Sequence, residues 1–337
     1  MSEGAGNRIP KTLADVSHLF FSTRVEEDAP AASRGGNTTT TGEERPAAPA
    51  RAAEHAAQEA RPRAAERTRI VVVTGGDDAP GKSTVAVNLA HGLLRWGSVG
   101  LFDADPRLPN ARFYLGLPSW QYLSPLTGDG RPSPAAALDS GLVVVDWTPD
   151  ATDASELART DGSVQLEIGG ASRRRLDYAV VDVPVGRLRL LHGCARRISR
   201  FVVVASPGWD GFAAACGAAS RLSTVLGARA VDLVVNRAPD ETYAAAYHRK
   251  FGMAARDVLS VEARLLAGVG RYTGLGCEQR ERGPLVRSRP DVAPALALRN
   301  AASSIAGSQP VAECAGARHG ARMERACEDE NPEIGAA

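Results

Sequence analysis

Short runs of apolar residues recur along the middle of the chain, separated by stretches with helical spacing. Each run is almost continuously apolar instead of alternating with polar residues, which is typical of strands covered on both faces. We expect strands at 70–73, 99–102, 142–145, 178–181, 201–205 and 231–235. The pattern predicts an α/β fold, a doubly wound and mostly parallel sheet with helices on both faces.

The two ends of the chain differ in composition from this middle part. Residues 25–67 are rich in Ala, Glu, Arg, Pro, Gly and Thr and contain almost no large apolar side chain, so they bury too little surface to offset chain entropy. The C-terminal stretch is polar and small in the same way. The division that we expect is a short helical docking motif at 1–24, a disordered linker at 25–67, one folded domain at 68–308 and a disordered tail at 309–337.

The N-terminal segment is the one apolar feature outside that domain. Leu13, Val16, Leu19 and Phe20 follow helical spacing within residues 9–24. A short apolar helix on a long tether suggests a peptide that docks into a groove of a protein partner. The alternative is a segment that packs back onto its own domain.

Composition and charge add few restrictions. The chain has 337 residues, is 44% hydrophobic and carries a net charge of +1, so its overall electrostatics do not support direct binding to DNA or to an anionic membrane. It has no run of about 18 apolar residues and no signal-peptide pattern. We therefore expect a cytoplasmic protein, which reaches the membrane only if a partner recruits it.

Cysteine spacing bears on metal and cluster chemistry. The five cysteines are Cys194, Cys216, Cys277, Cys314 and Cys327, and no two form a C-x-x-C pair. This spacing argues against a disulfide scaffold and against a zinc or iron–sulfur site within the chain.

A phosphate-binding loop follows the first expected strand. Residues 76–83 read GDDAPGKS and match G-x-x-x-x-G-K-[ST] between a strand and a helix. Lys82 would reach the β- and γ-phosphates of a nucleotide, and Ser83 would place a hydroxyl on Mg²⁺. The nucleotide-binding residues expected here are Gly76, Pro80, Gly81, Lys82, Ser83 and Thr84. The alternative is a Gly/Pro-rich turn that binds nothing.

Acidic residues close two further strands. Asp103 and Asp105 follow the run at 99–102, and Asp182 follows the run at 178–181 in the frame YAVVDVPVG. Asp182 has the position of a Walker B acid, so we expect Ser83, Asp103 and Asp182 to serve Mg²⁺ and a carboxylate of the D-x-D pair to activate water. An Asp that closes a strand is also a common helix N-cap.

Asn236 and Arg237 stand just past the last expected strand. The amide could read an adenine edge and the guanidinium could stack on the ring, so both join the expected nucleotide-binding residues. The alternative for Asn236 is a residue that simply ends the strand.

Taken in order, TGGDDAPGKSTVAVNLA, LFDADPRLPNARFYLGL, DYAVVDVPVG and LVVNR resemble the MinD/ParA-type ATPases, the deviant Walker A group of P-loop NTPases. The resemblance covers about residues 69–306, and residues 277–302 are similar to the closing segment of the flagellar-number branch, FlhG or FleN. It implies that Lys82 binds phosphate and acts in catalysis, that Ser83 and Asp182 serve Mg²⁺, that Asp105 activates the attacking water and that Asn236 contacts adenine.

The resemblance also implies an ATP-dependent sandwich dimer that hydrolyses ATP to ADP and phosphate. The family carries a signature lysine five residues before the phosphate lysine, and this chain has Asp77 there, followed by Asp78. A carboxylate reverses the sign of that contact with a neighbouring triphosphate, which puts the dimer and its hydrolysis in doubt. We expect a slow, ATP–Mg²⁺-dependent switch that positions or regulates a cell-envelope machine, flagellar or similar.

Other interpretations stay open at this point. A hydrolysis-deficient adaptor could act through its N-terminal motif, for example in exopolysaccharide or cellulose secretion. The bacterial tyrosine kinases share a stretch like DADPRLP, but this chain has no tyrosine after Tyr272. The iron–sulfur carrier branch needs a cysteine pair, so we expect no iron–sulfur cluster.

Overall fold

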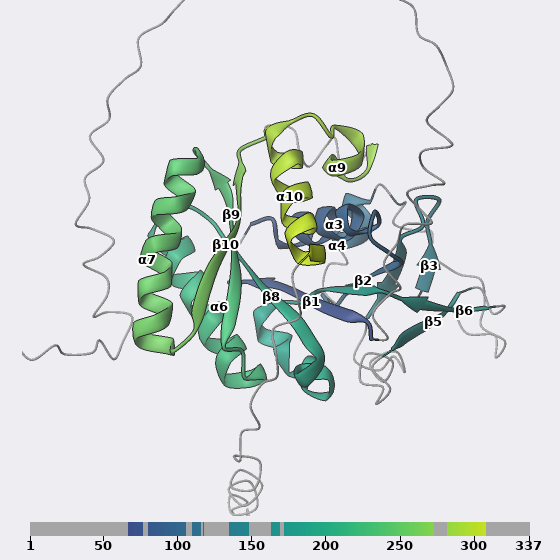
Figure 1. Ribbon diagram of the computed structural model, residues 1–337, viewed down its shortest axis with the longest axis horizontal. Helices are drawn as coiled ribbons and strands as arrows, with labels where there is room; N and C mark the ends of the chain where they lie inside the picture. The colour runs from purple at the N-terminus through teal and green to yellow at the C-terminus, as the bar shows by residue number, and fades with distance from the viewer. Residues whose placement is uncertain are drawn as a thin grey trace, which may run out of the picture.

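A central sheet with helices on both faces forms the part of the chain that the computed structural model describes (Figure 1). The described residues are 67–76, 80–105, 110–115, 117, 135–147, 163–168, 172–272 and 282–307. The expected docking motif, the linker up to residue 66 and the tail lie outside these ranges, and so do Asp77 and Asp78.

The sheet has eight strands in the order β10-β9-β8-β1-β7-β2-β4-β3. Neighbouring strands are parallel, except that β3 runs antiparallel to β4. Its strands are β1 (Arg69–Gly75), β2 (Val99–Asp103), β3 (Ala135–Ala137), β4 (Val143–Asp146), β7 (Tyr178–Asp182), β8 (Ile198–Ala205), β9 (Ala230–Ala238) and β10 (Glu262–Gly270). The doubly wound, mostly parallel fold is confirmed, and each of the six expected strands is present.

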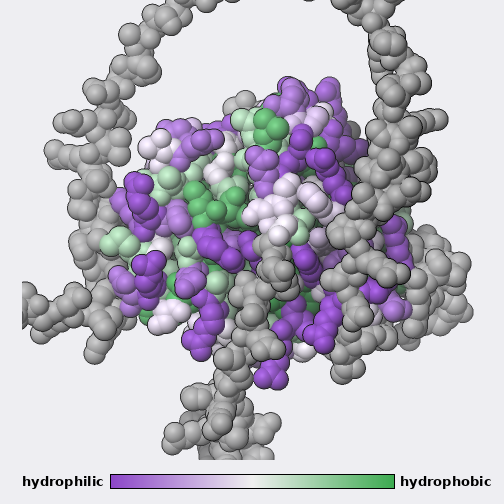
Figure 2. All heavy atoms as spheres, in the orientation of Figure 1, coloured by the Kyte–Doolittle hydropathy of each residue, from purple (hydrophilic) through white to green (hydrophobic). Residues whose placement is uncertain are grey.

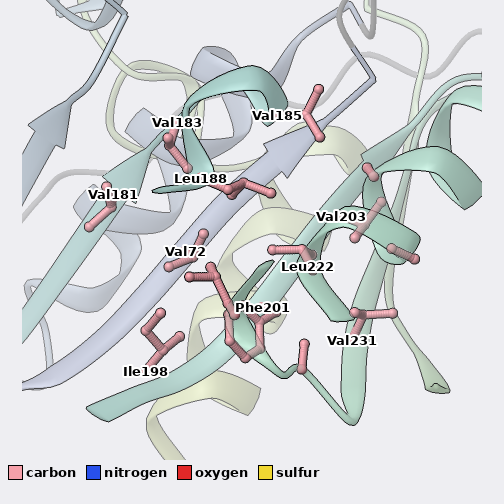
Figure 3. Close-up of a cluster of buried hydrophobic side chains, with 14 of the residues drawn as sticks. Val72, Val181, Val183, Val185, Leu188, Ile198, Phe201, Val203, Leu222 and Val231 are labelled. Atoms are coloured by element: carbon pink, nitrogen blue, oxygen red, sulfur yellow. The ribbon is translucent and has the colours of Figure 1, made fainter. Parts of the chain in front are cut away.

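Helices cover the two faces of this sheet. One face carries α3 (Lys82–Leu93), α4 (Asn110–Tyr114), α9 (Leu285–Ser288) and α10 (Ala293–Gly307), and the other carries η2 (Val185–Arg197), α6 (Trp209–Leu226) and α7 (Glu241–Leu259). Alternate residues of β1 serve opposite cores: Val72 faces the α6 side, while Val71 and Val73 face the α3 side. Figure 3 shows part of the first core, where Val72, Val203 and Leu222 lie together. This double burial is why the strands read as continuous apolar runs.

Helices α3 and α10 pack closely against each other on one face. A Cβ atom added at Gly92 of α3 would lie 2.7 Å from the Cβ atom of Ala302 in α10. Asn88, also buried in α3, joins the same helix to α9: its Oδ1 accepts from the Val286 N–H at 3.0 Å. The C-terminal helices are therefore fixed to the helix that follows the phosphate loop.

In addition to β3, the structure contains three strands that the sequence did not predict. β10 forms one edge of the sheet, and its exposed residues interrupt the apolar run; Leu265 is 37% exposed. Figure 2 shows a small apolar area in the middle of the view, where β10 runs in Figure 1, surrounded by hydrophilic residues. The other two, β5 (Val164–Ile168) and β6 (Ser172–Leu176), form a separate antiparallel hairpin.

Two of these strands lack a sequence signal because of their composition. β6 reads SRRRL, and three consecutive arginines give no apolar run. In β10, which reads EARLLAGVG, charged residues and positions of Gly or Ala interrupt the large apolar residues. None of the helices that the structure describes is long and apolar enough to cross a membrane.

Candidate nucleotide-binding site

The expected site residues meet at the carboxyl edge of the sheet. β1 leads into the phosphate loop, β2 ends at Asp103, β7 ends at Asp182, and β9 carries Asn236 near its end. The strands are parallel, so these ends share one edge, where open α/β sheets bind their ligands. In the order of the sheet, β1 lies between β8 and β7, which brings the loop next to Asp182.

The glycines of the loop are required by close packing. Gly81 has φ 95°, in the left-handed region, and a Cβ atom there would overlap Nδ2 of Asn236. A Cβ atom at Gly76 would overlap the Cβ atom of Ala214 in α6. Gly76 is therefore packed against α6 and Gly81 against the side chain of Asn236 near the end of β9, with no room for a side chain at either position.

Lys82 and the first turn of α3 present positive charge to this loop. The Lys82 ammonium donates to the Gly76 carbonyl oxygen at 3.1 Å, so the side chain folds back across the loop. Gly81 has no side chain with which to cap the helix, and the first turn of α3 has no acidic residue. The N-terminal N–H groups and the helix dipole therefore favour an anion here.

Asp182 has a carboxyl group with a raised pKa in this site. Its side chain is buried, and burial raises its pKa to about 6, against the opposing effects of a hydrogen bond with Ser83 and the charge of Lys82. The charge of Asp105 raises the pKa further, which shows that these four groups lie close enough to interact. Within the described part of the chain, no hydrogen-bond partner reaches Oδ2 of Asp182.

This arrangement fits a divalent cation. A buried carboxylate oxygen without a partner is costly, and an oxygen-preferring cation beside it would compensate the charge. Ser83 offers a hydroxyl next to the same carboxylate. The predicted pair of Mg²⁺ residues, Ser83 and Asp182, is thus brought together.

Asp103 has a different environment from the one expected for a metal-binding residue. Its side chain is buried, Oδ1 accepts from the Asp105 N–H at 3.0 Å, and Oδ2 accepts from the Ala111 N–H at 2.9 Å. Both oxygens therefore accept from backbone donors, one just past the end of β2 and one in α4. Asp105 itself is partly exposed. Magnesium binding by Asp103 stays a prediction, and the geometry favours a structural task for it.

Asn236 and Arg237 also differ from each other. Asn236 is buried, and its Nδ2 donates to the Pro80 carbonyl oxygen at 2.9 Å, so it contacts the phosphate loop. Arg237 is exposed and has φ 60°, a strained value for a residue other than glycine. The two residues lie at the edge of the site, and their contacts with an adenine ring stay predictions. The alternative that Asn236 only ends the strand does not account for its bond to the loop.

One buried residue near the site was not singled out from the sequence. The amide of Asn88 donates to the Thr84 carbonyl oxygen at 2.8 Å, one turn after the phosphate loop, while its oxygen holds α9. The signal was an amide on an otherwise apolar helix surface, where a buried polar side chain requires partners. Thr84, expected among the nucleotide-binding residues, is largely buried at this position.

The sequence has detectable relatives among curated proteins. It is 28% identical over 249 residues to the putative septum site-determining protein MinD of Guillardia theta, covering 72% of this chain and 89% of that protein. It is 28% identical over 266 residues to an iron-sulfur cluster carrier protein of Synechocystis, covering 72% of this chain and 71% of that protein. It is 25% identical over 248 residues to the flagellum site-determining protein YlxH of Helicobacter pylori, covering 66% and 77%. No family model matches the sequence.

The fold is similar to a solved structure as well. The MinC:MinD cell division protein complex of Aquifex aeolicus gives a TM-score of 0.53 at 20% identity, over 72% of this chain and 97% of that chain. At this identity the likeness concerns the fold alone.

The expectation that this protein has no link to iron–sulfur clusters is wrong. From the missing cysteine pair we expected no iron–sulfur cluster, yet several relatives at 27–28% identity are named iron-sulfur cluster carrier proteins. Cysteine spacing addresses only ligand sets that one chain supplies by itself in a short motif. Cys194 and Cys216 are buried, and burial raises the pKa of their thiols to about 11 and about 12. The other three cysteines lie outside the described residues.

Proposed function

We propose, from its membership of the MinD/ParA-type ATPases, that this protein is a regulatory ATPase that binds ATP with Mg²⁺ and acts as a nucleotide switch. The observation that carries the proposal is the buried Asp182 carboxylate beside Ser83 and Lys82 at the start of α3. A strand end, a glycine-bounded loop and a helix N-terminus converge there, which is the arrangement that binds nucleotide phosphates.

The loop and Lys82 supply the phosphate contacts in this proposal. The Lys82 ammonium is held by the Gly76 carbonyl oxygen, a bond that a phosphate oxygen can replace. Because the lysine and the helix N–H groups are already placed at the loop, they can stabilise charge on a transferring phosphoryl group with little rearrangement. Asn236 and Arg237 would then contact the base at the rim of the site.

Ser83 and Asp182 would hold Mg²⁺. The cation would supply neutralisation of charge on the β- and γ-phosphate oxygens. Ser83 would offer a hydroxyl and Asp182 a carboxylate to the cation. Asp105 is close enough for its charge to act on Asp182.

Asp105 would orient the attacking water or accept its proton. Its charge is felt at Asp182, yet its side chain is partly exposed, so it can reach water. A carboxylate within hydrogen-bond reach of water would orient that water for attack on the γ-phosphate or accept its proton.

The process served is proposed from the relatives. Two of them are named for septum and flagellum site determination, so we propose that the switch positions or regulates a machine of the cell envelope, flagellar or similar. Other relatives are named as iron–sulfur cluster carriers. Visible absorption spectra after anaerobic incubation with iron and sulfide distinguish that activity from a positioning switch.

A second candidate is a hydrolysis-deficient adaptor that binds nucleotide without turning it over. The specific observation in its favour is Asp77, which stands where the family has its signature lysine. A carboxylate there would repel a triphosphate and would not supply the cation that the family uses.

Phosphate release measured with ATP and Mg²⁺ separates the two candidates. The regulatory ATPase predicts slow turnover that Asp105→Ala removes while nucleotide binding is kept. The adaptor predicts binding and no turnover in the parent protein. If Asp105→Ala hydrolyses ATP at the parent rate, the role given to Asp105 is wrong.

A further inference from the structure

We propose that Asp103 is a positioning residue whose carboxylate holds the backbone of Asp105 in place for the reaction. The inference rests on the proposed function, since it concerns the residue that would act on water. It deepens that proposal by giving Asp103 a task other than binding Mg²⁺.

The primary observation is a two-sided set of hydrogen bonds. Oδ1 of Asp103 accepts from the Asp105 N–H at 3.0 Å, and Oδ2 accepts from the Ala111 N–H at 2.9 Å. The first donor lies just past the end of β2 and the second lies in α4, so one carboxylate joins Asp105 to the start of α4. An ionised acceptor makes stronger bonds to backbone N–H groups than a neutral one does.

The backbone around Asp103 is fixed from the neighbouring strands too. The Ala104 N–H donates to the Asp182 carbonyl oxygen at 2.9 Å, and the Trp147 N–H donates to the Asp103 carbonyl oxygen at 2.8 Å. Residues 103 and 104 are thereby anchored to β7 and to the end of β4. Asp105 is the first residue beyond these strand contacts, and the Asp103 carboxylate is what holds its N–H.

Burial makes this role specific to a carboxylate. Asp103 is 3% exposed, so bonds lost there are not replaced freely by water. An amide in its place keeps one acceptor oxygen, but its NH₂ group would face the second backbone N–H, donor against donor. Asp103→Asn therefore loses the bond to the N–H of either Asp105 or Ala111 while it preserves the size of the side chain.

The experiment compares the full-length parent protein with Asp103→Asn. Positioning predicts a fall in kcat of roughly tenfold to a hundredfold, since a misplacement of about 1 Å can cost about a hundredfold. It also predicts an ATP Kd within about twofold of the parent, an unchanged Mg²⁺ concentration for half-maximal turnover, and faster hydrogen exchange of the amides of Asp105 or Ala111.

Asp177→Asn is the matched control. Oδ2 of Asp177 accepts from the Ser98 N–H at 2.8 Å, a comparable carboxylate–backbone bond at the opposite edge of the sheet. This variant should lose stability, keep the parent kcat and keep the exchange rates at Asp105 and Ala111.

Other results overturn the inference. Asp103→Asn could instead need more Mg²⁺ for half-maximal turnover while the amides of Asp105 and Ala111 exchange as in the parent. That result would show that Asp103 binds the metal and does not position Asp105. An unchanged kcat in an active enzyme would deny Asp103 any positioning task. If the parent protein shows no turnover, the proposed ATPase activity is wrong. Independently of turnover, unchanged exchange of the Asp105 and Ala111 amides in Asp103→Asn would refute the proposal that the Asp103 carboxylate holds the Asp105 backbone.

Discussion

The amide of Asn236, near the end of β9, donates a hydrogen bond to the carbonyl oxygen of Pro80 in the phosphate loop at 2.9 Å. The two residues are 156 positions apart in the chain. Gly81, the next residue of the loop, approaches the same amide so closely that a side chain there would overlap it. The proposed base-contact residue and the phosphate loop therefore form one unit.

The first prediction follows from this unit. Asn236→Ala removes the bond and leaves space beside Gly81, so Pro80 and Gly81 should be held less firmly and ATP should bind roughly tenfold more weakly. Fluorescence titration with a labelled nucleotide measures the change. Asn300→Ala, at an exposed position of α10, is the control and should bind as the parent does. Equal affinities in both variants would show that the Pro80 contact has no part in binding.

The second prediction concerns pH and Mg²⁺. Burial raises the pKa of Asp182 to about 6, and only the ionised carboxylate attracts a cation. Mg²⁺-dependent tightening of nucleotide binding should therefore be present at pH 7.5 and decline as the pH falls through 6. The dependence should be absent in Asp182→Asn. A parent protein whose Mg²⁺ response is constant from pH 5 to 7.5 would contradict the assignment.

The third prediction concerns stability without metal. A carboxyl group with a raised pKa in the folded state binds more protons when folded, so the unfolding free energy falls as the pH rises from about 4 to about 6. The contribution lost above pH 6 is at most about 3 kcal/mol. In EDTA at pH 7.5, Asp182→Asn should then unfold at higher denaturant than the parent. A less stable variant would show that the buried charge is compensated within the chain.

A fourth prediction tests the contact between α3 and α10. Gly92→Val would drive a side chain into Ala302, since even a Cβ atom lies 2.7 Å from that residue's Cβ. Overpacking of this kind lowers the free energy of unfolding by about 1–3 kcal/mol. The helix propensity of Val contributes little to this loss. Thermal unfolding measures the loss. Gly217→Val in α6, where an added Cβ meets no neighbour within 4 Å, is the control and should lose less.

The sequence predicted the parts of this fold whose signal is local. The strands β1, β7 and β8 are buried on both faces, and their Val-rich runs state that directly. β10 lies at the edge of the sheet and is largely exposed or half-buried, so it has Glu and Arg near its start and contains two glycines, and its apolar signal is weaker. In the hairpin β5–β6, β5 alternates apolar and polar residues and β6 contains three consecutive arginines, so neither strand is a continuous apolar run.

The candidate site divides along the same line. The loop, Lys82 and Asp182 are recognisable because strand, turn and helix follow one another in sequence. The tasks of Asp103 and Asn236 depend on which backbone groups the folded chain brings to them, Ala111 in one case and Pro80 in the other. A residue type and its place at a strand end do not specify such partners, so both roles emerged only with the structure.

The most direct measurement is titration calorimetry of the protein with ATP at millimolar Mg²⁺, beside Lys82→Ala. The account predicts saturable heat for the parent, loss of that heat in Lys82→Ala and weakening in EDTA. Binding by the parent would show that the loop accepts a triphosphate in spite of Asp77 and Asp78. No heat with ATP or ADP from the folded parent protein would contradict the proposed nucleotide switch.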